Sequence, residues 1–185
     1  MDNFLSFLIG ILSSSVVAVS TIYFVFWKWK PRIEISKYIV EGYDKNNNLI
    51  YKIKLINRSK FEANDIKVEL WKKTEYKATS NTKGFNESVE KVSVSTNEWL
   101  TIPKYINNQK INNLNYAPHC ITLKIVNEDV NKILDITSNQ SLEFKISVKH
   151  GLSNISKTFS MDYNDSNCLR RGRFIFGNSL ETEEI

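Results

Sequence analysis

Two histidines, His119 and His150, and two cysteines, Cys120 and Cys168, are the side chains best suited to acid–base, nucleophilic or metal chemistry in this chain. Hydrolysis or group transfer needs a nucleophile, a base and an orienting group within hydrogen-bond reach, and neither histidine has an obvious set of partners. Each histidine adjoins an expected strand, so we interpret both as surface or loop-edge residues. We therefore expect no catalytic residues and a protein that is not an enzyme.

The same residues do not match the spacing of a metal site. His119 and Cys120 are adjacent, and no Cys-x-x-Cys or His-x-x-x-His pattern accompanies them, so we expect no metal and no cofactor. Gly172 and Gly177 flank a strand-like segment rather than the start of a helix, which is not the pattern of a glycine-rich phosphate loop.

A basic segment near the carboxy terminus, residues 168–177, is the best candidate for a ligand site. The guanidinium groups of Arg170, Arg171 and Arg173 can hold phosphates while Phe174 and Phe176 stack on bases, as in proteins that bind single-stranded nucleic acid. The alternative is a last strand whose phenylalanines enter the core and whose arginines reach solvent or lipid headgroups.

The element that comes first in the chain is a long apolar segment. Residues 4–27 contain no charged side chain. A helix of roughly 24 residues rises about 36 Å, which is enough to cross a hydrocarbon core of about 30 Å. We expect one transmembrane helix. The alternative is a signal peptide cleaved near Ala18 and Ser20, but the positive charges follow the apolar segment instead of preceding it.

The charges around this segment predict its orientation. Asp2 is the only ionisable side chain before it, whereas several cations follow it, and positive charge stays on the cytoplasmic side. The amino terminus should face outward and the soluble part should lie in the cytoplasm, where Cys120 and Cys168 stay reduced without a disulfide. The many Asn, Lys and Ile residues favour a bacterium, and hence its inner membrane. The expected anchors at the lipid interface are Trp27, Lys28, Trp29, Lys30 and Arg32.

One face of the expected helix is small or hydroxylated. Small residues let helices approach closely, and hydroxyls hydrogen-bond between helices in lipid, so we expect self-association around a narrow channel. The alternative is a solitary span in which each serine bonds back to the preceding turn. The interface or pore residues in this stripe are Ser6, Gly10, Ser13, Ser14, Val17, Ser20 and Thr21.

Beyond Pro31 the hydrophobic pattern changes to a period of two, which is typical of strands. Ile66, Val68 and Leu70, for example, alternate with polar residues. We find no convincing amphipathic helix there, so the pattern predicts an all-β sandwich or barrel. Expected strands are 33–42, 49–56, 66–70, 91–94, 121–126, 142–148 and 155–161, with loops at 79–88 and 107–116.

The expected domains are a helix with its juxtamembrane segment at 1–30, one β domain at 31–178 and an acidic tail at 179–185. About 150 residues suit a single core. The tail, with its glutamates at 181–184, is expected to be disordered.

Residues 56–70 resemble the strand-to-strand corner of immunoglobulin-like modules, in which an Asn ends one strand and a small residue followed by Asp begins the next. Here these residues are Asn57, Ala63 and Asp65. Asn57 and Asp65 can bond their own backbone at the corner, and Ala63 suits close packing. The predicted fold class is therefore all-β, an immunoglobulin-like antiparallel β-sandwich after one transmembrane helix.

The plan of the whole chain resembles the small membrane effectors of bacterial anti-phage defence, in particular the membrane effector of the Hailong system. The resemblance covers the architecture of all 185 residues, and with its one span the chain departs from the two-span effectors that carry a β-barrel. It implies a homo-oligomeric channel, a tetramer, that is held closed by a DNA oligomer from a partner nucleotidyltransferase. Loss of the oligomer then opens the channel and depolarises the cell.

The ligand implied is a single-stranded DNA oligomer or a nucleotide, for which Arg170, Arg171 and Arg173 are the expected phosphate partners. Two other functions fit the sequence. One is a single-pass adaptor that presents an immunoglobulin-like module to a protein partner, and the other is an anchored binder of envelope material, which requires the opposite orientation. The net charge of +5 is modest and does not by itself indicate a nucleic-acid partner.

Overall fold

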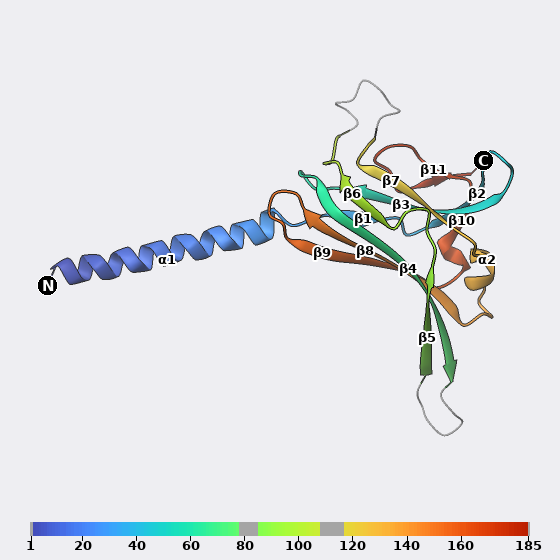
Figure 1. Ribbon diagram of the computed structural model, residues 1–185, viewed down its shortest axis with the longest axis horizontal. Coiled ribbons are helices and arrows are strands. Elements are labelled where there is room, and N and C mark those ends of the chain that lie inside the picture. The colour runs from blue at the N-terminus through green and yellow to red at the C-terminus, as the bar shows by residue number, and fades with distance from the viewer. Residues whose placement is uncertain (1, 78–84, 108–116, 185) are drawn as a thin grey trace.

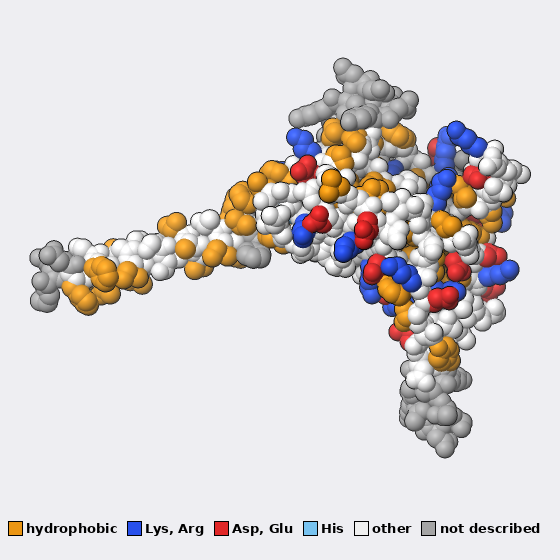
Figure 2. All heavy atoms as spheres, in the orientation of Figure 1, with side chains coloured by type: hydrophobic (Ala, Val, Ile, Leu, Met, Phe, Trp, Pro, Cys, Tyr) orange, Lys and Arg blue, Asp and Glu red, His pale blue; other side chains and the backbone are white. Residues whose placement is uncertain are grey.

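In the computed structural model one long helix projects from a β-rich domain (Figure 1). The structure describes residues 2–77, 85–107 and 117–184, without the side chains at 2, 3, 26–28, 77 and 85. The helix, α1 (Asp2–Lys28), contains the segment Phe4–Val25, which is long and apolar enough to span a membrane. None of its most apolar window is buried in the protein, and hydrophobic side chains line it along its length (Figure 2). The expected helix is confirmed, and its surface is suited to lipid.

The β domain is built from short and long strands, and the colours of Figure 1 mark their order along the chain. Their bounds are β1 Ile33–Ile35, β2 Ile39–Tyr43, β3 Leu49–Asn57, β4 Ala63–Lys77, β5 Phe85–Val92, β6 Glu98–Ile102, β7 Cys120–Ile125, β8 Gln140–His150, β9 Ser156–Tyr163, β10 Leu169–Arg171, β11 Arg173–Phe174 and β12 Thr182–Glu183. A single helical turn, α2 (Val130–Ile133), and a 3₁₀ turn, η2 (Ser166–Cys168), complete the described elements.

Within the described residues the strands form two five-stranded sheets and one two-stranded sheet. In the first five-stranded sheet β3 is central: β7 pairs along one edge, and β1 and then β2 pair along the other. In the second, β4 is central, with β8 on one edge and β6 and β5 in succession on the other, while β9 pairs with β8. The chain is therefore mostly β with several sheets, as expected.

The two larger sheets share one hydrophobic core. Alternate residues of β8, including Phe144 and Ile146, are fully buried, and they belong to the same core as Ile53 and Leu123 of the first sheet. This period of two is the pattern that the sequence predicted for a sheet buried on one face. One pair departs from the expected antiparallel arrangement, because β10 runs parallel to β2.

Several expected boundaries are wrong. The strand expected at 33–42 is interrupted at Ser36, which is buried and accepts a 2.6 Å hydrogen bond from the Tyr163 hydroxyl at its carbonyl. The loop expected at 79–88 is strand from Phe85 onward, because those residues pair with β4. Its first part, 79–84, and residues 108–116 of the other expected loop lie outside the described residues.

The acidic tail is also structured where it was expected to be disordered. Thr182 and Glu183 form β12, which pairs with β11, and the Ile175 amide donates a hydrogen bond to the Glu181 carbonyl. An ion pair between Arg173 and Glu183 adds to this contact. The tail is therefore held by a hairpin-like pairing that its composition did not reveal.

The corner that resembles immunoglobulin-like modules forms largely as expected. Asn57 ends β3 and bonds its own loop, because its Oδ1 accepts from the Ser59 amide at 2.9 Å and its side-chain amide donates to the Phe61 carbonyl at 3.2 Å. The same amide also donates to the carbonyls of Pro103 at 2.9 Å and Ile102 at 3.3 Å, and Ala63 begins β4 fully buried. Asp65 behaves differently from the expectation. It has a positive φ of 48° beside an irregularity in the β4–β8 register, and its carboxylate accepts a 2.6 Å hydrogen bond from Lys149.

Candidate functional site at the helix and β-domain junction

The end of α1 is bonded to the β domain. The Trp29 amide donates to the Val25 carbonyl over 3.0 Å and so continues the helical pattern. The Trp29 carbonyl accepts a 2.6 Å hydrogen bond from the hydroxyl of Ser153, which lies in the turn between β8 and β9. A carbonyl in the last turn of a helix has no partner within the helix, so the serine caps it from the β domain.

The linker that follows, residues 30–32, is also held to the β domain by hydrogen bonds. The Arg32 amide donates to the Ser59 hydroxyl over 2.8 Å, and the Arg32 carbonyl accepts from the Arg58 amide over 2.8 Å. Pro31, which precedes Arg32, is buried, and its ring restricts the backbone further. β1 then begins at Ile33 and pairs with β3. The helix therefore enters the β domain through a stiff, hydrogen-bonded segment and not through a flexible tether.

A pocket of about 480 Å³ lies at this junction. Its aromatic walls come from both sides of the junction: the ring centroids of Phe24 and Trp29 are 6.1 Å apart, and those of Phe61 and His150 are 5.1 Å apart. The described residues that line it are Phe24, Trp29, Lys30, Arg32, Arg58, Ser59, Lys60, Phe61 and His150, with no carboxylate among them.

The charges in this junction pocket are largely unneutralised. The Arg58 guanidinium is already bonded within the β domain, because its Nε donates to Glu34 over 2.8 Å and its Nη2 donates to the Asn178 carbonyl over 3.0 Å. Within the part of the chain that the structure describes, the side chains of Lys30, Arg32 and Lys60 form no ion pair. Three positive charges therefore face a pocket without a counter-charge of its own.

His150 adds no positive charge to the pocket near neutral pH. Only 2% of its surface is exposed, and burial lowers its pKa below the usual 6.5. Its Nδ1 accepts a 3.3 Å hydrogen bond from the Ser153 amide. A neutral ring at this position both packs against Phe61 and holds the turn that caps α1.

The arginines singled out by the sequence lie elsewhere, on β10 and β11. Arg171 is 3.4 Å from the Glu41 carboxylate, and Arg173 pairs with Glu183. Arg170 stacks over the Tyr38 ring at 4.5 Å from its centroid. The structure thus neutralises two of the three guanidinium groups within the chain and leaves Arg170 against an aromatic ring.

Lys37 joins Arg170 at this ring, with its Nζ 5.0 Å from the Tyr38 centroid. Hydrogen bonding from Arg170, and then from Lys37, lowers the pKa of Tyr38 below its usual value. The two aromatic residues of the segment do not join the main core: Phe174 is half-buried and Phe176 is exposed. A phosphate and a base can therefore reach this face, but Figure 2 shows positive and negative side chains intermingled over the visible β domain.

The small stripe of α1 is open to a neighbour. A Cβ built on Gly10 would meet nothing within 4 Å. The hydroxyls of Ser14 and Thr21 donate back to the carbonyls of Gly10 at 2.7 Å and Val17 at 2.8 Å, and Ser13 likewise bonds to Gly10 at 3.0 Å. This is the bonding of the solitary-span alternative. The structure describes no side chain at Trp27 or Lys28, whereas Trp29, Lys30 and Arg32 line the junction pocket.

Ser6 and Ser20 differ from the other hydroxyls of the stripe. Among the described residues neither has a hydrogen-bond partner, although both lie on the exposed helix. In lipid an unpaired hydroxyl has no water to bond, so each either turns back to its own helix or bonds to a second one.

Both histidines are buried, so the surface assignment was wrong, although each does adjoin a strand end as expected. His119 contacts Asn178 Oδ1 through its Nε2, while the Asn178 amide donates to the Tyr105 hydroxyl and the Ile106 carbonyl. The amide orientation makes His119 Nε2 the donor. Its Nδ1 is buried without a partner among the described residues.

Sequence reasoning also missed Lys54, which is 4% exposed on β3. Its ammonium donates to three carbonyls of the carboxy-terminal segment, Ile175 at 2.6 Å, Gly177 at 2.8 Å and Ser179 at 2.7 Å. Burial lowers its pKa below the usual value. In residues 49–56 Lys54 alternates with apolar residues just as Lys52 does, which is the pattern of a solvated face, so no local signal in the sequence pointed to this cage.

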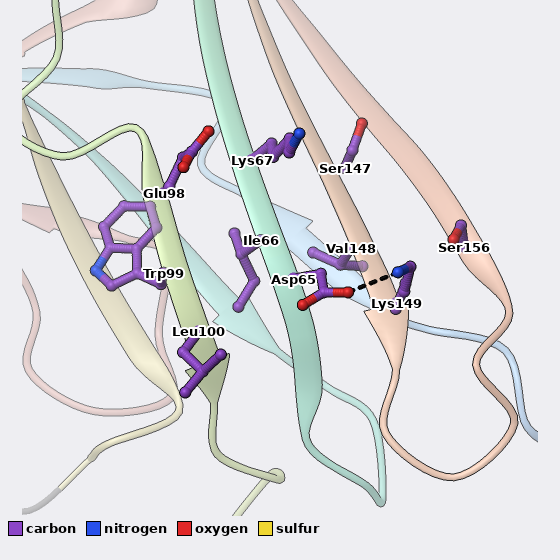
Figure 3. Close-up of a pocket in the computed structure, with 10 residues that line it drawn as sticks. All are labelled: Asp65, Ile66, Lys67, Glu98, Trp99, Leu100, Ser147, Val148, Lys149 and Ser156. Carbon is purple, nitrogen blue, oxygen red and sulfur yellow. Dashed lines mark hydrogen bonds and ion pairs between the residues drawn. The ribbon is translucent and has the colours of Figure 1, made fainter.

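A larger groove of about 580 Å³ crosses the outer face of the second sheet (Figure 3). Charges of both signs line it: Asp65 is bonded to Lys149, and Glu98 and Lys67 lie on neighbouring strands. Because these charges oppose one another, the groove has no clear preference for a charged ligand. The junction pocket, with charge of one sign, is the stronger candidate site.

Comparison with protein-family models gives no match for this chain, and comparison with curated proteins gives none either. The functional case therefore depends on the chemistry and geometry of the residues described above.

Proposed function

We propose that this chain is a membrane effector of bacterial anti-phage defence that oligomerises through its single transmembrane helix into a gated pore. A cytoplasmic, immunoglobulin-like β-sandwich binds a nucleic-acid or nucleotide signal that controls opening. The amino terminus faces outward across the inner membrane, and pore opening depolarises the cell. The resemblance in overall plan to the Hailong effector provides the biological setting.

The observation that carries this function is the hydrogen-bonded junction. A ligand shifts a closed-to-open equilibrium only by its different affinity for the two states, so a change in the β domain has to reach the helices. The bonds from Ser153 to Trp29 and from Arg32 to Ser59 supply a direct mechanical connection. A flexible linker would lose such a change, whereas this junction transmits it.

Association of the helices is supported by the width and composition of the stripe. At 100° per residue its seven members cover about 120° of the helix circumference, wide enough for contact with neighbours on both sides. Gly10 allows close backbone approach, and Ser6 and Ser20 retain hydroxyls for bonds between helices.

Binding of the signal is assigned to Arg170, Arg171 and Arg173. A polyanion that approaches this face meets Arg170 with Lys37 and Tyr38 directly, and it competes with Glu41 for Arg171 and with Glu183 for Arg173. A phosphate that replaces two internal carboxylates changes contacts on β2 and β12, which gives the ligand a way to favour one state.

Ion flux from liposomes containing the full chain tests this function. Ser13→Leu and Ser14→Leu should each reduce flux several-fold, because a bulky side chain on the stripe obstructs the axis. Ser15→Leu is the matched control, since Ser15 bonds back to Ile11 in the same way but lies on the opposite face. Equal flux from all three variants and the unaltered chain would contradict the pore. Addition of a single-stranded DNA oligomer should change flux, and Arg170→Gln should weaken that response.

The second candidate is a single-pass adaptor that presents the β domain to a protein partner. The hydroxyls of Ser13, Ser14 and Thr21 favour the adaptor, because they hydrogen-bond to carbonyls of their own helix and need no second helix as a partner. An adaptor conducts no ions, so absence of flux together with a monomeric chain supports this alternative.

A further inference from the structure

The depth of the junction pocket is its most informative property. Phe24 lies in the last turn of the candidate span, Phe4–Val25, and it lines the pocket together with Trp29 and Lys30. From Phe24 to Trp29 the helix rises about 7 Å, which matches the about 5 to 8 Å of headgroup layer on each side of a bilayer. The pocket therefore opens at the level where phospholipid phosphates lie.

The polarity of the lining changes along this depth. Phe24, which is 49% exposed, is on the hydrocarbon side, while Lys30, Arg32 and Lys60 are on the side of the β domain. A phospholipid has the same arrangement, with an acyl glycerol above and a phosphate below. The volume of about 480 Å³ is also within the range of small-molecule sites, about 300 to 1,000 Å³.

We infer that the junction pocket binds the phosphate of one anionic phospholipid, with Lys30, Arg32 and Lys60 as its charge partners and Phe24 and Trp29 against its glycerol and upper acyl carbons. These three cations have no ion pair within the described residues, and no carboxylate lines the pocket to compete for them. Lys60 comes from the β3–β4 corner and Lys30 from the linker, so the lipid joins the helix to the β domain.

Free phosphate and a lipid headgroup offer the same chemistry to these cations. The aromatic wall favours the lipid, because inorganic phosphate or a nucleotide phosphate in water makes no use of an exposed Phe24 inside the span. This inference shares the membrane span and the junction with the proposed function, but it does not depend on self-association of the helices. A chain that binds the lipid but stays monomeric would support it and contradict the pore.

Native mass spectrometry of the full chain in a neutral detergent tests the inference, with phosphatidylglycerol, phosphatidylcholine or inorganic phosphate added separately. We expect one phosphatidylglycerol molecule per chain to remain bound at concentrations where phosphatidylcholine does not. Arg32→Gln with Lys60→Gln should weaken retention about 25-fold, at about fivefold for each cation near the membrane surface. The backbone hydrogen bonds of Arg32 are unaffected by this change.

The matched control carries Lys45→Gln and Lys132→Gln, which remove the same charge from exposed positions outside the pocket. It should retain the lipid as the unaltered chain does, and thermal unfolding should show both double variants folded. Equal retention of the two lipids, or equal loss in both double variants, would overturn the pocket assignment. Inorganic phosphate that displaces phosphatidylglycerol at millimolar concentration would overturn the lipid as the source of the phosphate.

Discussion

The Ser153 hydroxyl and the Trp29 carbonyl meet at 2.6 Å, which joins the turn between β8 and β9 to the last turn of α1. The same turn is held by His150, whose Nδ1 accepts from the Ser153 amide. These two hydrogen bonds connect the second sheet directly to the end of the candidate span.

Replacing Ser153 by Ala should loosen this connection without unfolding the domain. The hydrogen bond to the helix-terminal carbonyl is lost, together with the longer contacts of the hydroxyl with His150 Nδ1 at 3.2 Å and the Ile155 amide at 3.4 Å, so the free energy of unfolding should fall by about 1 to 2 kcal/mol. Amide hydrogen exchange at Trp29, Lys30 and Arg32 should become faster. Ser147→Ala is the control, because its hydroxyl pairs with Thr158 on the exposed sheet surface and should leave residues 29–32 unchanged. Unchanged exchange in Ser153→Ala would contradict the mechanical connection.

Replacing Lys54 by Met should be strongly destabilising. The change leaves the carbonyls of Ile175, Gly177 and Ser179 without their donor, and the expected loss in free energy of unfolding is about 3 kcal/mol. Lys52→Met on the same face of β3 is the control and should cost far less. Urea unfolding of the full chain in detergent measures both. Similar stability of the two variants would show that the ammonium cage does not hold the carboxy-terminal segment.

Acidification should weaken the domain through His150. Its pKa is lowered in the folded state, so between that value and about 6.5 the unfolded chain binds more protons. This contribution to stability is complete above pH 6.5 and decreases as the pH falls toward the folded-state value. His150→Gln should have a smaller loss of stability between pH 7 and pH 5 in urea unfolding. An identical pH dependence in both proteins would exclude His150 as its source.

Replacing Asn57 by Ala should destabilise the corner between β3 and β4. The buried amide donates to the carbonyls of Ile102 and Pro103, and its loss should reduce the free energy of unfolding by about 2 to 3 kcal/mol. Asn57→Asp provides a sharper comparison, because it keeps the acceptor for the Ser59 amide while it removes the donors. If Asn57→Asp had the same free energy of unfolding as the unaltered chain, the hydrogen bonds donated by Asn57 would not contribute to the stability of the corner.

Local patterns in the sequence predicted the parts of the fold that depend on neighbouring residues. The charge-free segment predicted the helix, and the alternation at Ile66, Val68 and Leu70 predicted a strand. The corner formed where expected, with Asn57 donating to the Phe61 carbonyl and accepting from the Ser59 amide. In each case the physical cause, whether helix hydrophobicity, a period of two or a side chain that bonds its own loop, acts within a few residues.

The parts of the fold that the sequence did not predict depend on contacts between residues far apart in the chain. β10 to β12 are short and rich in Arg and Glu, and they form because β2 pairs with β10 and because Lys54 holds the carbonyls that follow. His119 is buried through Asn178, which no local pattern indicates. The junction pocket likewise joins residues near 24–32, 58–61 and 150, and only the folded chain brings them together.

The mass of the full chain in detergent or nanodiscs tests the central claim most directly. Self-association through the stripe predicts a species at a multiple of the 21.5 kDa chain mass, a tetramer by resemblance to the Hailong effectors, which Ser13→Leu and Ser14→Leu disrupt and Ser15→Leu does not. Monomers under every condition, with or without lipid and nucleic acid, would contradict a pore and leave the adaptor.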